Sequence, residues 1–246
     1  MKHAAAFVCA LAAATAATAA AAPPARSVKE ETALYTFEYA YPASAAAVPG
    51  LRTALEADRA RHLAALRRDA RAGGAEAQEN GYPFRKHAWT QTWQVVTEIP
   101  GWLSLSASYW NYTGGAHGMS WSGAMLWDRR AGRARSPLDL FTSKAALSAA
   151  IRQPFCAALD RQRADKRGTP VNRTGGGEFD QCIDPVAQTV ILGSHGRQAF
   201  DRIGILVAPY SAGPYAEGSY EVTVPVTPAV MAAVKPVFRA SFAAAK

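Results

Sequence analysis

The sequence predicts an α+β fold, in which antiparallel sheets pack against a long N-terminal amphipathic helix and against helices from the C-terminal half. Two observations support this class. Segments that alternate apolar and polar residues, as strands do, occur near both ends of the chain. Helical patterns lie before the second strand segment and between the two groups of strands, an order typical of α+β proteins. A chain of 246 residues is long enough to bury a substantial core.

The first 22 residues predict a secretory signal peptide. A basic start at Lys2 precedes an alanine-rich apolar run, and small residues suited to cleavage lie near Ala22. A membrane span is a weaker interpretation, because alanine is only slightly apolar and no basic flank follows the run. We therefore expect a periplasmic or secreted protein with no stable membrane span.

The net charge is +8 at pH 7. Removal of Lys2 with the signal peptide lowers the charge to about +7, which favours anionic surfaces or acidic partners. Nucleic acid is not an expected partner, because the protein is predicted to be exported.

The predicted N-terminal subdomain, residues 30–127, begins with a strand over 32–41 that Pro42 ends. The next segment, 48–72, spaces leucines at a helical period, and Gly73-Gly74 predicts its end. Arginines fill the other face of this helix. They could form a binding stripe, but a solvated face is the favoured interpretation.

Two strands over 89–99 and 102–112 follow, joined by the Pro100-Gly101 turn into a hairpin. One face of the second strand is apolar and the other is rich in serine, since successive side chains point to opposite faces. A third strand over 121–128 and a turn at 130–132 extend the same sheet.

The predicted C-terminal subdomain, residues 128–246, starts with helices that Thr142 or Ser143 would cap. Short strands follow from Gln188 onward, and the segment after Thr227-Pro228 predicts a closing helix. Cys156 and Cys182 are the only cysteines beyond the signal peptide, and in an oxidising compartment we expect them to form a disulfide. Two unpaired buried thiols are the alternative.

The motif YTGGAHGM, residues 112–119, is the main candidate for a functional site. Its glycines permit backbone paths that side chains would block, and they place His117 at a tight corner. His117 can fasten the turn by hydrogen bonds, contact a ligand, or act as a base beside a carboxylate that the sequence does not reveal. The first of these roles is favoured.

No residue is predicted to be catalytic, and no metal or other cofactor is predicted. The histidines show neither the paired spacing nor the cysteine context of a zinc site. Ser194 precedes His195, but adjacency along the chain is not the geometry that a nucleophile and its base require.

Three motifs taken together resemble a known exported domain. YTGGAHG, SPLDLF and APYSAGPYAEGSYEVTVPV are similar, in their order and spacing, to the domain of the RsiV anti-sigma factor and of the PdaC peptidoglycan deacetylase outside its catalytic part. These are the domains of unknown function numbered 4163 and 3298. The resemblance covers roughly 33–238.

The resemblance implies an α+β module that recognises a cell-wall-related partner, which in RsiV is lysozyme. We therefore expect a non-enzymatic binding protein whose partner is a lysozyme-like cell-wall hydrolase or a glycan of peptidoglycan. The alternative is a peptidoglycan-directed hydrolase or deacetylase that uses His117. The predicted ligand-contacting or partner-contacting residues are Tyr112, His117, Pro209, Tyr210 and Tyr215.

Overall fold

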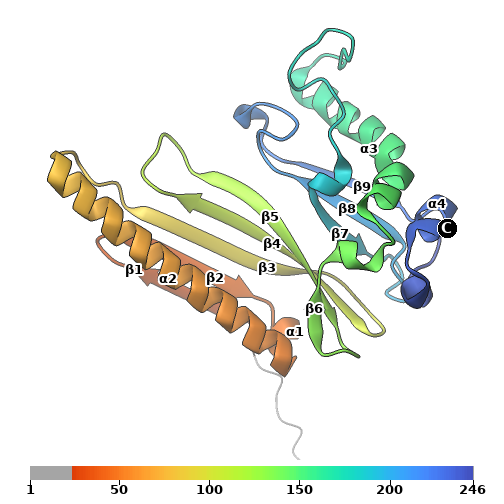
Figure 1. Cartoon of the computed structure of the whole chain (residues 1–246), viewed down its shortest axis with the longest axis horizontal. Helices are drawn as coiled ribbons and strands as arrows, with labels where there is room; N and C mark the ends of the chain where they lie inside the picture. The colour runs from red at the N-terminus through yellow and green to blue at the C-terminus, as the bar shows by residue number, and fades with distance from the viewer. Residues whose placement is uncertain (1–23, 246) are drawn as a thin grey trace, which may run out of the picture.

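A computed structural model describes residues 24–245 of the chain, so the predicted signal peptide lies outside the described part. The predicted α+β class is confirmed: one six-stranded sheet and one three-stranded sheet are combined with a long N-terminal helix and later helices (Figure 1). Within the described residues, no helix has the length and apolar character that a membrane crossing requires.

The larger sheet has the strand order β1-β2-β3-β4-β5-β6. Neighbouring strands are antiparallel except β2 and β3, which run parallel because helix α2 crosses between them. The predicted hairpin and the third strand are confirmed as β3, β4 and β5, whereas β1 and β6 were not predicted. The strands are β1 Arg26–Glu31, β2 Tyr35–Tyr41, β3 His87–Ile99, β4 Trp102–Tyr112, β5 Met119–Asp128 and β6 Arg133–Arg135.

Helix α2, Pro49–Asn80, lies along one face of this sheet after the short helix α1, Ala43–Ala46 (Figure 1). The prediction that Gly73-Gly74 ends the helix is wrong, because the helix continues to Asn80 and ends at Gly81, which adopts a left-handed φ of 68°. The two glycines serve close packing instead. A Cβ at Gly73 would lie 3.2 Å from the His87 ring.

The smaller sheet has the order β7-β8-β9 and is antiparallel, with the strands Thr189–Gly193, Arg202–Val207 and Tyr220–Pro225. Helix α3, Lys144–Arg167, packs against it, with Ser143 as the N-cap. The predicted closing helix is confirmed as α4, Pro228–Ala233, with proline in its first turn. Short 3-10 helices lie at Pro137–Leu140 (η1), Pro185–Ala187 (η2), Tyr215–Glu217 (η3) and Pro236–Ser241 (η4).

Two hydrophobic cores result. One lies between α2 and the apolar face of the larger sheet, and contains Leu103 and Leu105. The other lies among α3, α4 and the smaller sheet, and Trp102 and Leu126 of the larger sheet also belong to it. The division of the chain at residue 127 remains a prediction.

The expected disulfide between Cys156 and Cys182 is present, with the two Cα atoms 5.6 Å apart. It ties the glycine-rich segment after α3 back to the middle of that helix. The smaller sheet also contacts the larger one directly, because the Thr189 hydroxyl donates to the Ser122 carbonyl oxygen at 2.7 Å. That contact places the β8–β9 connection near the end of the β4–β5 hairpin.

Candidate binding site

The turn between β4 and β5 carries the YTGGAHGM motif, and two of its glycines have a clear physical reason. Gly114 has φ +94°, a backbone conformation that side chains disfavour. Gly118 lies under the indole of Trp110, and a Cβ there would come within 2.4 Å of three ring atoms. The turn therefore needs glycine at both positions to bring His117 to its observed place.

His117 is exposed and is oriented by its neighbours. Its Nδ1 lies 2.9 Å from the carbonyl oxygen of Gly118, and because a carbonyl only accepts, Nδ1 carries the hydrogen. The other nitrogen, Nε2, can then accept from the Tyr210 hydroxyl at 3.4 Å. The imidazole also stacks on the ring of Tyr215, with the ring centroids 4.1 Å apart.

The two tyrosines come from the connection between β8 and β9. Tyr215 opens the short helix η3 and donates its hydroxyl to the Gly118 carbonyl at 3.1 Å. The rings of Tyr210 and Tyr215 lie 5.4 Å apart. We call His117, Tyr210 and Tyr215 the aromatic cluster.

Tyr210 has an unusual backbone. Its φ of +67° lies in the left-handed region, where a residue with a Cβ is strained. Its side chain is nevertheless 48% exposed. The protein thus holds a large aromatic side chain outward on a costly backbone, an arrangement found more often at contact sites than at packing positions.

The remaining predicted contact residues lie beside the cluster. Tyr112 donates its hydroxyl to the Gly115 carbonyl at 2.9 Å and stacks on Trp110, so it supports the turn from its other side. Pro209 lines a cavity together with Trp110. The structure therefore brings the five predicted residues to one end of the molecule, although their role in binding remains a prediction.

Three basic residues at the C-terminal end of α3 hold the loop that carries the tyrosines. Arg163 is fully buried and donates to the carbonyl oxygens of Ala212 and Gln181 at 2.8 and 3.1 Å. Lys166 donates to the carbonyl oxygens of Glu217 and Ser219.

Arg167 completes this support through an ion pair with Glu217 at 2.8 Å. Burial alone would raise the pKa of Glu217, but hydrogen bonds from Arg167 and Tyr220 outweigh it and lower that pKa. The same environment raises the pKa of Tyr220 to about 12, chiefly through burial and then through the Glu217 carboxylate. These residues were not predicted to belong to the site. The basic segment RQRADKR at the helix end is the only signal for them in the sequence, and it resembles a solvated face.

The polar surroundings of the His117 ring consist of a main-chain carbonyl and a phenol. Within residues 24–245, no carboxylate makes a hydrogen bond or an ion pair with its ring. The same part of the chain contains no group of three histidine, cysteine, aspartate or glutamate side chains placed to hold a metal ion. These two partners orient the imidazole in the turn.

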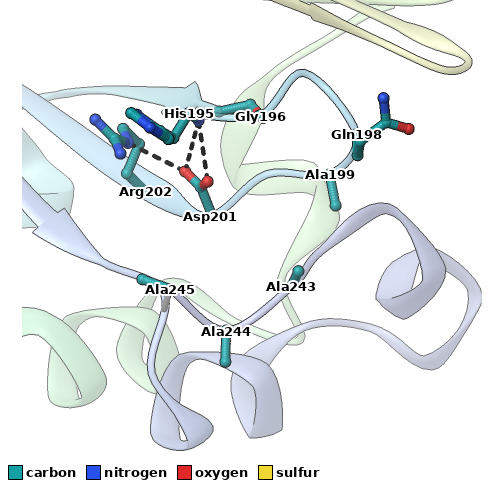
Figure 2. Close-up of a pocket in the computed structure, with 10 residues that line it drawn as sticks. His195, Gly196, Gln198, Ala199, Asp201, Arg202, Ala243, Ala244 and Ala245 are labelled. Carbon is teal, nitrogen blue, oxygen red and sulfur yellow. Dashed lines mark hydrogen bonds and ion pairs between the residues drawn. The ribbon is translucent and has the colours of Figure 1, made fainter.

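The Ser194-His195 pair lies in another cavity, of about 490 Å³, next to the C-terminal segment 243–245 (Figure 2). There the Asp201 carboxylate accepts from the backbone N–H of His195 at 3.0 Å and pairs with Arg202. Because the acid binds the main chain of His195 rather than its ring, a serine-histidine-aspartate triad does not form.

Comparison with known proteins agrees with this architecture. Residues 28–120, which span β1 through the His117 turn, match the family model described as "Deacetylase PdaC". The fold is similar to that of a DUF3298 family protein from Pseudomonas aeruginosa, which aligns with a TM-score of 0.52 at 20% identity, over 90% of this chain and 97% of the other.

A DUF3298 member from Bacteroides fragilis also aligns, with a TM-score of 0.48 at 16% identity, over 82% of this chain and 89% of the other. No curated protein sequence matches the chain. The expected resemblance to PdaC and DUF3298 is thus confirmed, whereas the resemblance to RsiV and to domain 4163 remains a prediction.

Proposed function

We propose that this chain is a periplasmic or secreted, non-enzymatic binding protein that recognises a lysozyme-like cell-wall hydrolase or a peptidoglycan fragment. The aromatic cluster carries the proposal. Tyrosines supply large, rigid contact area, and residues of this kind dominate the energetics of protein interfaces. Here Tyr215 and His117 are held by partly buried hydrogen bonds to the Gly118 carbonyl oxygen, and both are at least partly open to solvent, as is Tyr210.

The exposed apolar surface supports the same location. Three of the six large apolar side chains that are exposed in the described residues are Trp110, Met119 and Tyr210. All three lie on or beside the His117 turn and the loop that meets it. Exposed apolar side chains that gather in one place mark interaction surfaces more often than isolated ones do.

The family match supports a cell-wall context, because the matching model is named for a deacetylase, PdaC. The motifs of the sequence also resemble two cell-wall-related proteins. One is the peptidoglycan deacetylase PdaC, and the other is RsiV, whose exported domain binds lysozyme. Lysozyme is basic, so a chain with net charge +8 needs a local acidic surface to bind it. Asp69 and Glu76 supply acidic groups in a cavity that Gly114 also lines, although Arg85 shares that cavity.

The proposal is tested by size-exclusion chromatography of the mature protein mixed with lysozyme, combined with a lysozyme activity assay. We expect co-elution and reduced lysozyme activity. Replacement of the Tyr210 side chain, as Tyr210→Ala or Tyr210→Gly, should weaken the complex by about tenfold, since both remove the aromatic contact.

The two variants separate binding from folding. Glycine accepts a positive φ, so Tyr210→Gly should be up to about 1 kcal/mol more stable than Tyr210→Ala while binding equally weakly. Val237→Ala, which shortens an exposed apolar side chain elsewhere, is the control and should bind as wild type. The proposal is contradicted if both Tyr210 variants bind as the wild type does. It is also contradicted if the wild type binds neither lysozyme nor peptidoglycan.

The second candidate is a peptidoglycan hydrolase or deacetylase that uses His117, and the name of the matching family model is its support. A His117→Ala variant that remains folded but loses turnover of muropeptides would establish it. Equal product formation by wild type and variant, or none by either, would reject it.

A further inference from the structure

A second concave surface lies beside the aromatic cluster, on the face of the larger sheet opposite α2. Strands β3, β4 and β5 form its floor, and the segments around Pro209 and Ser219 form its wall. The cavity has a volume of about 280 Å³. We call it the hydroxyl groove.

The floor of the groove is a regular grid that follows from the strand register. Thr90 pairs with Trp110, which pairs with Ser120, so these three form one row across the sheet. The next row is Thr92, Ser108 and Ser122 in the same way. Because residues two apart along a strand share a face, both rows point into the groove.

These hydroxyl groups are free to bind a ligand. Within the described residues, no hydrogen bond inside the protein involves the side-chain oxygen of any serine or threonine that lines the groove, and these six are Thr90, Thr92, Ser108, Ser120, Ser122 and Ser219. A hydroxyl both donates and accepts, so the groove offers paired donors and acceptors at short intervals. An apolar ligand would leave them without partners, at a cost in free energy.

The charge of the groove argues against an anionic ligand. Among residues 24–245, Glu221 is the only charged residue that lines it, and no lysine or arginine of that part does so, although the net charge of the chain is +8. Anions are bound by arginine, lysine or helix N-termini, none of which forms this floor. A neutral ligand rich in hydroxyl groups fits the lining, with the Glu221 carboxylate accepting from one of them.

Trp110 adds a flat apolar surface to the polar floor. Its indole is 36% exposed, packs against Gly118, and lies beside the ring of Tyr112, with the two ring centroids 6.4 Å apart. Its Nε1 is among the ring atoms nearest to Gly118. An aromatic face next to hydroxyls matches a sugar ring, which has an apolar C–H face and hydroxyls at its edge.

We infer that the hydroxyl groove binds a short neutral glycan segment, stacked on Trp110 and hydrogen-bonded to the threonine and serine grid. The inference deepens the proposed function, on which it rests, by assigning the glycan to the groove and leaving the aromatic cluster for a protein partner. The two sites adjoin, since Gly118 contacts Trp110 and its carbonyl accepts from Tyr215.

The test is isothermal titration calorimetry of the mature protein with chitotetraose and, separately, cellotetraose, which differ in their N-acetyl groups. We expect binding of at least one. The double variant Thr90→Val, Ser120→Ala removes two hydroxyls with little change of shape, and should weaken binding by about tenfold. Trp110→Ala should weaken it at least as much.

Thr36→Val is the matched control, because Thr36 lies on β2 away from the groove, and it should bind as wild type. Circular dichroism of each variant confirms folding, and the double variant keeps the inference testable if Trp110→Ala unfolds. Absence of binding to both glycans, or wild-type affinity in the double variant, overturns the inference. Lysozyme co-elution is also measured for the wild type and the double variant. If glycan binding is absent but lysozyme co-elutes, the groove inference fails while the proposed function stands; if neither binds, both fail.

Discussion

Gly118 and Gly115 lie three positions apart in the His117 turn but have different surroundings. A Cβ added at Gly118 would meet the Trp110 indole at 2.4 Å, whereas one added at Gly115 would meet nothing within 4 Å. Neither has a positive φ, so backbone strain does not distinguish them. The difference between them is one of packing alone.

We therefore predict that Gly118→Ala destabilises the protein by about 1–3 kcal/mol, because the indole must move away from the new methyl group. Gly115→Ala should stay within about 0.5 kcal/mol of wild type. Urea denaturation measures both values. Equal stability of the two variants would show that Trp110 is free to shift and is not held in place by the turn.

At the scale of single elements, the short hairpin of β5 and β6 depends on Asp128. This buried carboxylate accepts from the backbone N–H groups of Arg130 and Ala131 and pairs with Arg135 at 2.8 Å. Burial alone would raise the pKa of Asp128, but the hydrogen bonds from Ala131 and Arg135 outweigh it and lower the pKa below its ordinary 3.8.

A lowered pKa in the folded state means that the stabilising contribution of Asp128 is present above pH 3.8 and is lost as the pH falls through the folded pKa. Asp128→Asn should therefore cost about 1–3 kcal/mol at pH 7, because an amide replaces the charged acceptor. The difference in unfolding free energy between Asp128→Asn and wild type should shrink below pH 3.8. Denaturation curves at pH 7 and pH 3 measure it, with the exposed Asp165→Asn as control; a gap that stays constant between these pH values contradicts the assignment.

At the scale of the whole molecule, the candidate site depends on helix α3, which in the described residues makes no hydrogen bond or ion pair with the His117 turn. Arg163 in α3 links the segment near the disulfide to the loop of the tyrosines, through the carbonyl oxygens of Gln181 and Ala212. Its burial lowers the pKa of the guanidinium, although Asp160 opposes that change. The loop therefore keeps its shape through a group hidden beneath it.

Arg163→Met should remove the donor of the Gln181 carbonyl oxygen and leave the Ala212 carbonyl oxygen with only the longer hydrogen bond from Arg167 at 3.4 Å, at a cost of about 1–3 kcal/mol. We also expect faster amide hydrogen exchange over residues 208–219 and weaker lysozyme binding, while exchange in α2 stays as in wild type. Arg161→Met, an exposed neighbour on the same helix, is the control. Unchanged exchange in the loop would show that Arg163 stabilises the core without positioning the site.

Much of the fold could be predicted because its signals are local. The alternation in β3, β4 and β9 marks strands, and Pro100-Gly101 marks the hairpin, since neighbouring residues carry this information. The end of α2 was predicted wrongly for the same reason. Gly73-Gly74 resembles a helix stop locally, but the Gly73 position also faces His87, and packing of the helix against that ring decided the outcome.

The sequence by itself determined the α+β class, the strands of both sheets apart from β1 and β6, the disulfide partners and the turn that carries His117, because each depends on periodicity, turn chemistry or cysteine count within one segment. Only the tertiary structure decided that His117 meets Tyr210, 93 residues away, that Arg163 supports their loop, and that the register of β3, β4 and β5 forms the hydroxyl groove. These contacts join segments that are distant along the chain, and the packing of one sheet against the other sets their geometry.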